Sequence, residues 1–369
     1  MSNRVRLLLL AFAATAALAY AGAALAAFTP TMSVSANPAR AASAGLTAIR
    51  VTVPREDEAL AKISILVPVG YTATFGQAAG TQLGSVTAQV QVREPVAGAV
   101  LPVTGTIQVA DPAAVSASVT QCTGTATHSA LWVLVLAAAG TELRVPVAVD
   151  TATAPFSAFA SHVLQICLPN PNIPTASGGA TFGAKLINAQ LNVRNVFSTP
   201  VTAGDYTWRA VATPWPNGAG APVAANTREA RAHIKLPVTT GITVTTAKRK
   251  VRGLRTVTVS GTVREGGAPM EGASVRITVG RTAKTVRVSA NARFTASFRL
   301  RRGRYAAALR ITTPERTAAA ACATPGPFQA GATPVPCATE TLPFYEAAPS
   351  GAPAGDNTLL VAARAFRVR

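Results

Sequence analysis

The sequence contains few of the side chains from which catalytic and metal-binding sites are usually built. Its 369 residues include only four cysteines and three histidines, His128, His162 and His233. No HExxH, GxSxG, GxGxxG or GxxxxGKS/T motif occurs in a supporting context, and no two cysteines have the CxxC spacing of a zinc site. From these absences we predict that the protein is not an enzyme and uses no cofactor and no metal ion.

Two features come closest to functional chemistry. His162 shares a strand face with Leu164 and Ile166, so we interpret it as a core histidine rather than a catalytic base. The acidic cluster Glu56-Asp57-Glu58 lacks the spaced oxygen ligands of a calcium loop, and we interpret it as a solvated turn.

Helical periodicity is also missing, and aromatic residues make up only 5% of the chain. Short runs of alternating apolar and polar residues, separated by Gly- and Pro-rich turns, are frequent instead, and this pattern is typical of strands. We predict an all-β fold of two or three tandem Ig-like β-sandwich domains after a signal peptide. The expected domains are 27–245, with a break near 98–112 if this region holds two subdomains, and 246–369.

The first 26 residues predict export. Arg4 and Arg6 form a basic start, an apolar stretch begins at Leu7, and Ala24-Leu25-Ala26 provides the small residues that a signal peptidase recognises. No later segment has the roughly 20 apolar residues needed to span a bilayer. We therefore expect the protein outside the cell or in the cell envelope.

The four cysteines allow three disulfide connectivities. In the oxidising environment of an exported protein we favour Cys122 with Cys167 and Cys322 with Cys337, because each bridge then stays within one domain. Cys122, Trp132 and Cys167 also follow the order found in immunoglobulin domains, where a tryptophan packs on a disulfide between two sheets. Gln165 stands where those domains have a tyrosine, and the spacing adds some support for a β-sandwich.

The positive charge is concentrated in the last third of the chain. From Lys248 onward there are 20 Lys and Arg residues against six Asp and Glu residues. In the predicted strands between residues 274 and 312, arginines alternate with apolar residues and are expected on the solvent side. They form a candidate polyanion-binding face of Arg276, Arg299, Arg301, Arg304 and Arg310. The alternative is a charged face that only keeps the domain soluble, with a codon bias toward arginine as the source of the high arginine content.

Two resemblances to known families imply folds. The segments SGTV, GGAPMEGASV, ARFTASF and LRRGRY resemble carboxypeptidase-regulatory-like and related bacterial Ig-like modules, which are small β-sandwiches appended to exported proteins. Near the start, SVSANPARAASAGLTAIRVTVP and AKISILVPVGY loosely resemble secreted bacterial Ig-like domains associated with copper. That family implies a metal-binding histidine at the mature N-terminus. Here the mature chain is expected to begin at Ala27, and no histidine precedes His128.

The predicted function is that of an exported structural, binding or adhesion protein of the bacterial cell envelope. The alternative is a polyanion-binding module that uses the basic C-terminal face. Expected partners are anionic envelope polymers or another envelope protein, and nucleic acid is not expected to be the natural ligand.

Overall fold

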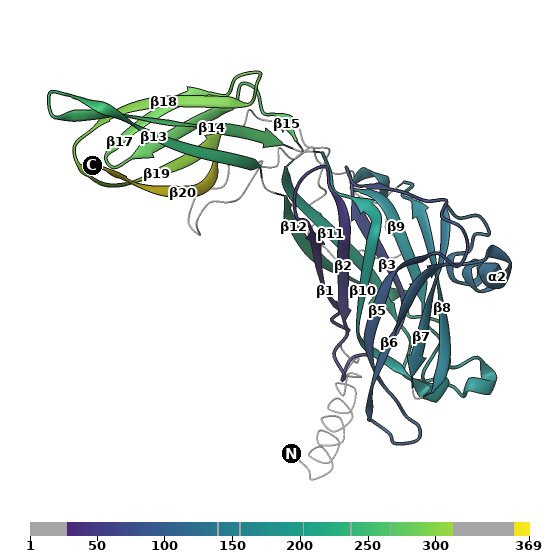
Figure 1. Ribbon diagram of the computed structural model, residues 1–369. Helices are drawn as coiled ribbons and strands as arrows, with labels where there is room; N and C mark the ends of the chain where they lie inside the picture. Colours follow the sequence, from purple (N-terminus) through teal and green to yellow (C-terminus); the bar gives the residue numbers. More distant parts are fainter. Residues whose placement is uncertain are drawn as a thin grey trace, which may run out of the picture.

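The computed structural model describes residues 28–138, 140–154, 156–201, 203–236, 238–265, 267–312 and 358–369. Strands dominate these residues, which confirms the all-β prediction, and they form three sheets, A, B and C. Sheet A is built by residues up to Leu236, whereas sheets B and C follow from Thr239 onward and form a C-terminal unit (Figure 1). The predicted signal peptide, residues 1–26, and the predicted Cys322–Cys337 bridge lie outside the described residues.

Sheet A has 12 strands in the order β1-β2-β10-β5-β6-β7-β8-β9-β3-β11-β12, and β4 pairs with β10. All its pairings are antiparallel. The strands are β1 (Thr31–Asn37), β2 (Ala44–Thr52), β3 (Leu60–Pro68), β4 (Thr72–Ala73), β5 (Gln82–Gln91), β6 (Val100–Val109), β7 (Ala130–Ala138), β8 (Thr141–Thr151), β9 (Ala160–Cys167), β10 (Lys185–Ser198), β11 (Gly204–Pro214) and β12 (Arg228–Leu236).

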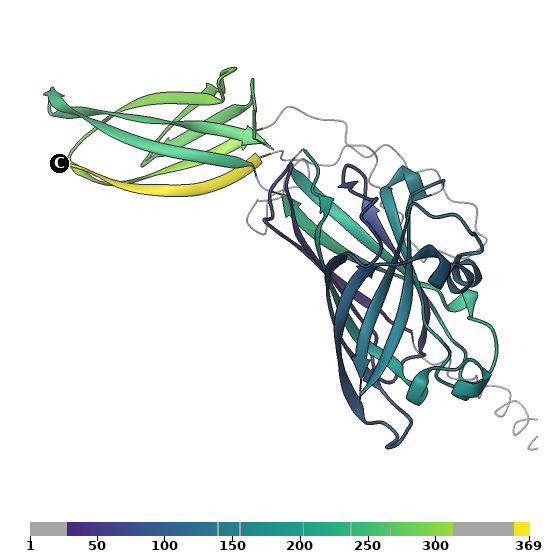
Figure 2. The ribbon, with the colours of Figure 1, turned by 45° about the vertical axis from the view of Figure 1, so that its right-hand side comes forward.

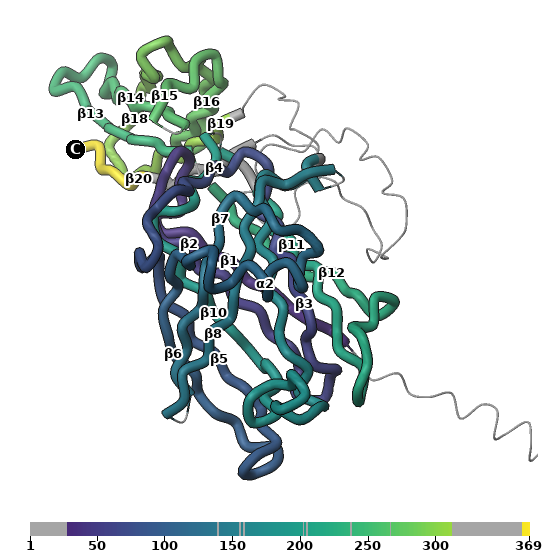
Figure 3. Tube along the Cα trace, turned by 90° about the vertical axis from the view of Figure 1, so that its right-hand side faces the viewer, coloured from purple at the N-terminus to yellow at the C-terminus, as the bar shows by residue number. Residues whose placement is uncertain are grey.

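Sheet A curls until its first and last strands, β1 and β12, lie side by side, so that it nearly closes on itself (Figures 1 and 3). Trp132, Phe197 and Trp208 are buried in the hydrophobic cluster that it encloses. This single curved sheet differs from the two-sheet sandwich that we expected for residues 27–245. The expected break near 98–112 falls on β6, which pairs with both β5 and β7. Continuous pairing is favourable here because it leaves few strand edges exposed.

A short helix, α2 (Pro112–Thr123), interrupts the strands and packs on the outside of sheet A against β8 and β9 (Figure 1). The Asp111 side chain caps its start by accepting a hydrogen bond from the Ala113 amide at 3.0 Å, and Gly124 ends it with a φ of 80°. The sequence contains signals for both ends of this helix, since Asp followed by Pro often marks a helix start and Gly often follows a helix end. No described helix has the length and apolar character required to cross a bilayer.

The predicted Cys122–Cys167 disulfide is confirmed, but its setting is not that of an immunoglobulin domain. Cys122 lies on α2 and Cys167 on β9, so the bridge ties a surface helix to the sheet. Trp132 is completely buried inside sheet A. The bridge therefore does not join two facing sheets with the tryptophan packed between them.

The C-terminal unit consists of two four-stranded antiparallel sheets around one hydrophobic cluster. Sheet B contains β13 (Thr239–Val251), β14 (Leu254–Glu265), β15 (Ala268–Pro269) and β18 (Arg293–Leu300). Sheet C has the order β17-β16-β19-β20 and contains β16 (Ser274–Val279), β17 (Thr282–Arg287), β19 (Gly303–Thr312) and β20 (Thr358–Val368). The expected domain boundary at residue 246 falls inside β13, which pairs with β14 from Thr239 onward.

The C-terminal unit forms a separate lobe joined to one end of sheet A (Figure 2). Ala203, which precedes β11, and Val238, which precedes β13, both belong to the hydrophobic cluster of this unit. The Glu265 carboxylate also accepts a hydrogen bond from the Ala203 amide. The junction therefore consists of apolar contacts and a buried polar contact.

Candidate functional site

The strand faces in the C-terminal unit follow the predicted alternation. Val275, Ile277, Phe294, Phe298 and Leu309 are all at most 2% exposed. The five arginines that alternate with such residues, Arg276, Arg299, Arg301, Arg304 and Arg310, are all exposed. Alternation therefore identified correctly which side chains face solvent.

The five arginines do not share one face. Arg299 lies on β18, which pairs with β14 in sheet B, whereas Arg276, Arg304 and Arg310 lie on β16 and β19 in sheet C. The chain passes from one sheet to the other at Arg301, between β18 and β19. The expectation of a single face was wrong because the order of strands along the chain does not fix the sheet that each strand joins.

The structure gathers basic residues instead at the end of the C-terminal unit that points away from sheet A. The turn between β13 and β14 and the end of β20 both lie at this end in two views (Figures 1 and 2). Leu300, at the end of β18, pairs with Arg255, which follows the β13–β14 turn. Gly303, at the start of β19, pairs with Val368, at the end of β20. The β18–β19 turn therefore lies beside both the β13–β14 turn and the end of β20. Gly280, in the β16–β17 turn, lies against the Tyr305 ring.

We call this region the basic end. Its Lys and Arg residues come from four segments that are distant in the sequence: Lys248, Arg249, Lys250, Arg252, Arg255, Arg281, Arg301, Arg302, Arg304 and Arg367. All of them are exposed except Arg255, which is half-buried and donates hydrogen bonds to the carbonyls of Ala247 at 3.1 Å and Lys248 at 2.7 Å. The residues of the KRKVR stretch, 248–252, were not part of the polyanion-binding face predicted from the sequence.

No described acidic residue lies at the basic end. Within the described C-terminal unit, the only Asp or Glu residues are Glu265 and Glu271. Glu265 accepts a hydrogen bond from Ala203 at the junction with sheet A. Glu271 lies just before β16, whose first residue pairs with Thr312. Thr312 is the last residue of β19, at the opposite end of that strand from the β18–β19 turn. Arg304 on β19 is also directly paired with Arg367 on the adjacent strand β20. Like charges in such positions repel, so an anion that binds between them is stabilising.

The outer face of sheet B has a different character. Its exposed or half-buried positions carry mainly hydroxyl side chains, which are Thr243, Thr245, Thr256, Thr258, Ser260, Thr262, Thr295 and Ser297. Thr258 and Ser297 lie opposite each other, with their hydroxyl oxygens 3.4 Å apart. Arg293 and Arg299 flank this surface at opposite ends of β18, so the positive charge is sparse here.

One arrangement in sheet A has the atoms of a catalytic relay. The His128 Nδ1 lies 2.7 Å from an Asp150 carboxylate oxygen, and its Nε2 lies 3.2 Å from the Thr123 hydroxyl. The Thr123 hydroxyl, however, donates to the Val119 carbonyl at 2.9 Å, and only 1% of the His128 side chain is exposed. These contacts indicate that His128 holds the segment after α2 against β8, and that the Thr123 hydroxyl is not a reactive group.

His162 lies on the inner side of sheet A between two aromatic rings, at 5.5 Å from Phe75 and 6.5 Å from Phe197. Its Nδ1 is 2.9 Å from the Ser161 hydroxyl. Burial lowers the pKa of His162, because the charged imidazolium is disfavoured in this apolar setting. This geometry agrees with its interpretation as a core histidine.

The acidic turn was interpreted wrongly as solvated, since two of its three side chains are buried. Asp57 is 7% exposed and accepts hydrogen bonds from the amide and hydroxyl of Thr29, at 2.5 and 2.9 Å. Glu58 is 6% exposed and accepts one from Asn226 at 3.1 Å. Among the residues that the structure describes, no group of three His, Cys, Asp or Glu side chains is placed to hold a metal ion.

Comparison with known proteins gives little guidance. No protein-family model matches the chain, and no curated protein matches it. Among solved structures, the chain is similar to a Ca²⁺-stabilised adhesin that helps an Antarctic bacterium to bind ice, with 15% identity over 78% of this chain and 70% of that chain. The TM-score is 0.15, so this likeness carries no argument about fold or function.

Proposed function

We propose that this chain is an exported, non-enzymatic binding protein of the cell envelope, and that its basic end attaches it to an anionic polymer. The predicted signal peptide and the Cys122–Cys167 disulfide support export, because disulfides persist in oxidising compartments. The C-terminal unit, with two sheets around one core, acts in this proposal as an Ig-like attachment module.

One observation carries the proposal. The basic end combines ten Lys and Arg residues from four segments, and no described acidic residue neutralises them. A face that serves only solubility normally mixes charges of both signs, because a field of one sign destabilises the folded unit. The position of this charge at the end away from sheet A also leaves it accessible to a long polymer (Figures 1 and 2).

The test is binding of the full chain to a purified wall teichoic acid, and to DNA as a second polyanion, across a salt series. The test variant Arg301→Gln/Arg302→Gln removes two charges from the basic end. The control variant Arg287→Gln/Arg293→Gln removes two exposed charges from the same unit outside the basic end. Each phosphate contact adds roughly one unit to the slope of log affinity against log salt.

We expect the teichoic acid to bind, with a slope about one to two units shallower for the test variant and unchanged for the control variant. Equal weakening by both variants would show that only the net charge matters. No binding to teichoic acid, or equally tight binding to DNA, would contradict attachment to an envelope polymer.

A further inference from the structure

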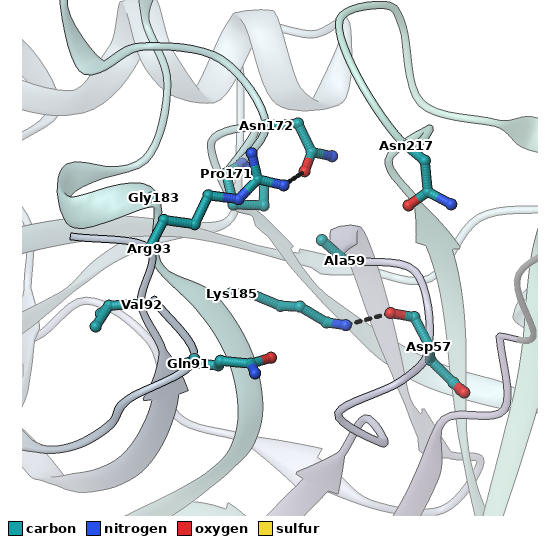
Figure 4. A pocket seen from close by; sticks show the side chains of 11 residues that line it. Asp57, Ala59, Gln91, Val92, Arg93, Pro171, Asn172, Gly183, Lys185 and Asn217 are labelled. Carbon is teal, nitrogen blue, oxygen red and sulfur yellow. Dashed lines mark hydrogen bonds between the residues drawn. The ribbon is translucent and has the colours of Figure 1, made fainter. Parts of the chain in front are cut away.

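A polar pocket with a volume of about 240 Å³ lies at one end of sheet A, far in sequence from the basic end. Gln91 ends β5, Lys185 starts β10, and these two residues are directly paired. Arg93 follows β5, while Asn172 and Asn217 come from the loops after β9 and β11. Figure 4 shows these side chains arranged around one common space.

Two cations line this space. The Arg93 guanidinium crosses its upper side and donates a hydrogen bond to the Asn172 side-chain oxygen (Figure 4). The Lys185 ammonium donates to the backbone carbonyls of Arg55, at 2.7 Å, and of Asp57. Both cations are therefore held in place by neutral oxygen atoms, and each keeps N–H donors for a ligand.

One oxygen of the single carboxylate in the lining is already hydrogen-bonded. An Asp57 carboxylate oxygen accepts both the amide and the hydroxyl hydrogen bonds of Thr29. Burial lowers the pKa of Lys185, the charges of Asp57 and the exposed Glu56 oppose this change, and the nearby Arg93 charge, the smallest of these effects, lowers the pKa. An anion between Arg93 and Lys185 would stabilise the buried Lys185 ammonium and offset its repulsion by Arg93.

The backbone beside the pocket has an unusual conformation where it contacts Arg93. Phe182 has a φ of 58°, a conformation that a bulky side chain rarely adopts, and its carbonyl accepts the Arg93 amide at 2.9 Å. Gly183 follows with a φ of 57°, and a Cβ there would lie 3.0 Å from the Arg93 side chain. Such strain is common at binding sites, where the fold holds a side chain in position.

We propose that this pocket binds a small hydroxylated molecule with one anionic group, a carboxylate or a phosphate, of the size of a single sugar residue. The planar Arg93 fork suits bidentate binding of either group, and Lys185 adds a second positive charge. The amides of Gln91 and Asn217 supply donors and acceptors for hydroxyl groups. The volume lies below the roughly 300–1,000 Å³ of pockets for drug-sized ligands, which suits one ring.

The test is isothermal titration calorimetry of the full chain with glucuronate, glucose 6-phosphate, glucose and inorganic phosphate. Arg93 is exposed, so Arg93→Gln is expected to leave the fold intact, and thermal unfolding checks this. Arg50→Gln is the matched control, because Arg50 is an exposed arginine of sheet A outside the pocket. Arg301→Gln/Arg302→Gln separates this site from the basic end.

We expect glucuronate or glucose 6-phosphate to bind more tightly than both glucose and inorganic phosphate, and the tighter of the two identifies the anionic group. Arg93→Gln should weaken that binding at least about tenfold, since it removes a charge-assisted contact. Arg50→Gln and the basic-end variant should bind like the wild type. Absence of binding to both sugar anions, equally tight binding of glucose or inorganic phosphate, or an unaffected Arg93→Gln variant would overturn the proposal.

Discussion

The carboxylate of Glu265, at the end of β14, accepts a hydrogen bond of 2.7 Å from the backbone amide of Ala203, just before β11. Glu265 is 9% exposed and Ala203 is 1% exposed. This buried contact joins the C-terminal unit to sheet A, at the end of the unit opposite the basic end.

Removal of this contact should weaken the junction. Glu265→Ala leaves the Ala203 amide without its carboxylate acceptor, and hydrogen bonds to charged groups contribute about 1.5–3 kcal/mol. We expect a loss of this size in the free energy of unfolding, measured by urea denaturation, and faster limited proteolysis between the units. Glu271→Ala, at an exposed position of the same unit, is the control and should change little. Equal effects of both variants would contradict the role of Glu265.

A buried ion pair on sheet A makes a second prediction. Glu229 accepts hydrogen bonds from Arg209 at 3.4 Å and Arg231 at 2.6 Å, and Arg209 also lies 4.3 Å from the centre of the Phe159 ring. Burial lowers the pKa of Arg209, and the Glu229 charge opposes this change.

Glu229→Gln removes the negative charge and leaves the Arg209 guanidinium buried, so we expect a loss of about 3 kcal/mol in the free energy of unfolding. The control is Glu142→Gln, which breaks the exposed Arg144–Glu142 pair and should cost less than about 1 kcal/mol. Chemical denaturation measures both losses. A loss at Glu229 no larger than the loss at Glu142 would sink this prediction.

The disulfide makes a third prediction, because Cys122 and Cys167 are separated by 45 residues in the sequence. A closed loop of this length restricts the unfolded chain by about 4 kcal/mol in the chain-entropy model. Cys122→Ala/Cys167→Ala should therefore lower the melting temperature clearly under non-reducing conditions, as measured by calorimetry. A melting temperature equal to that of the wild type would show that the bridge does not stabilise sheet A.

The burial of His162 predicts a dependence of stability on pH. Its folded pKa is lowered from the ordinary value of 6.5, so below that pH the unfolded chain binds the proton more readily than the folded chain. Stability from this residue is complete above pH 6.5 and decreases as the pH falls toward the folded pKa.

The measurement is urea denaturation between pH 7.5 and pH 5. His162→Gln should lose less stability over this range than the wild type, because Gln does not titrate. His233→Gln, at an exposed position of β12, controls for the removal of an imidazole. If His162→Gln and the wild type lose stability in parallel, the pH dependence has another source.

Local patterns predicted much of the fold. Alternation predicted the surface positions of Arg276 and Arg299, and the neighbouring Val275 and Phe298 are buried, because side chains of a strand point to opposite faces in turn. Helix α2 was missed although Asp111 and Gly124 mark its ends, because a single helical segment between strands has little periodicity to recognise.

The amino-acid sequence was enough to predict the all-β class and the outward-facing arginines between residues 274 and 312, since both depend on neighbours along the chain. It also predicted the Cys122–Cys167 pair. The tertiary structure was needed to show that β18 joins sheet B while β19 joins sheet C, which separates Arg299 from Arg310 and brings together the four segments of the basic end. It likewise places Arg93 beside Lys185, because the pairing of Gln91 with Lys185 is a long-range choice among many strands of similar pattern.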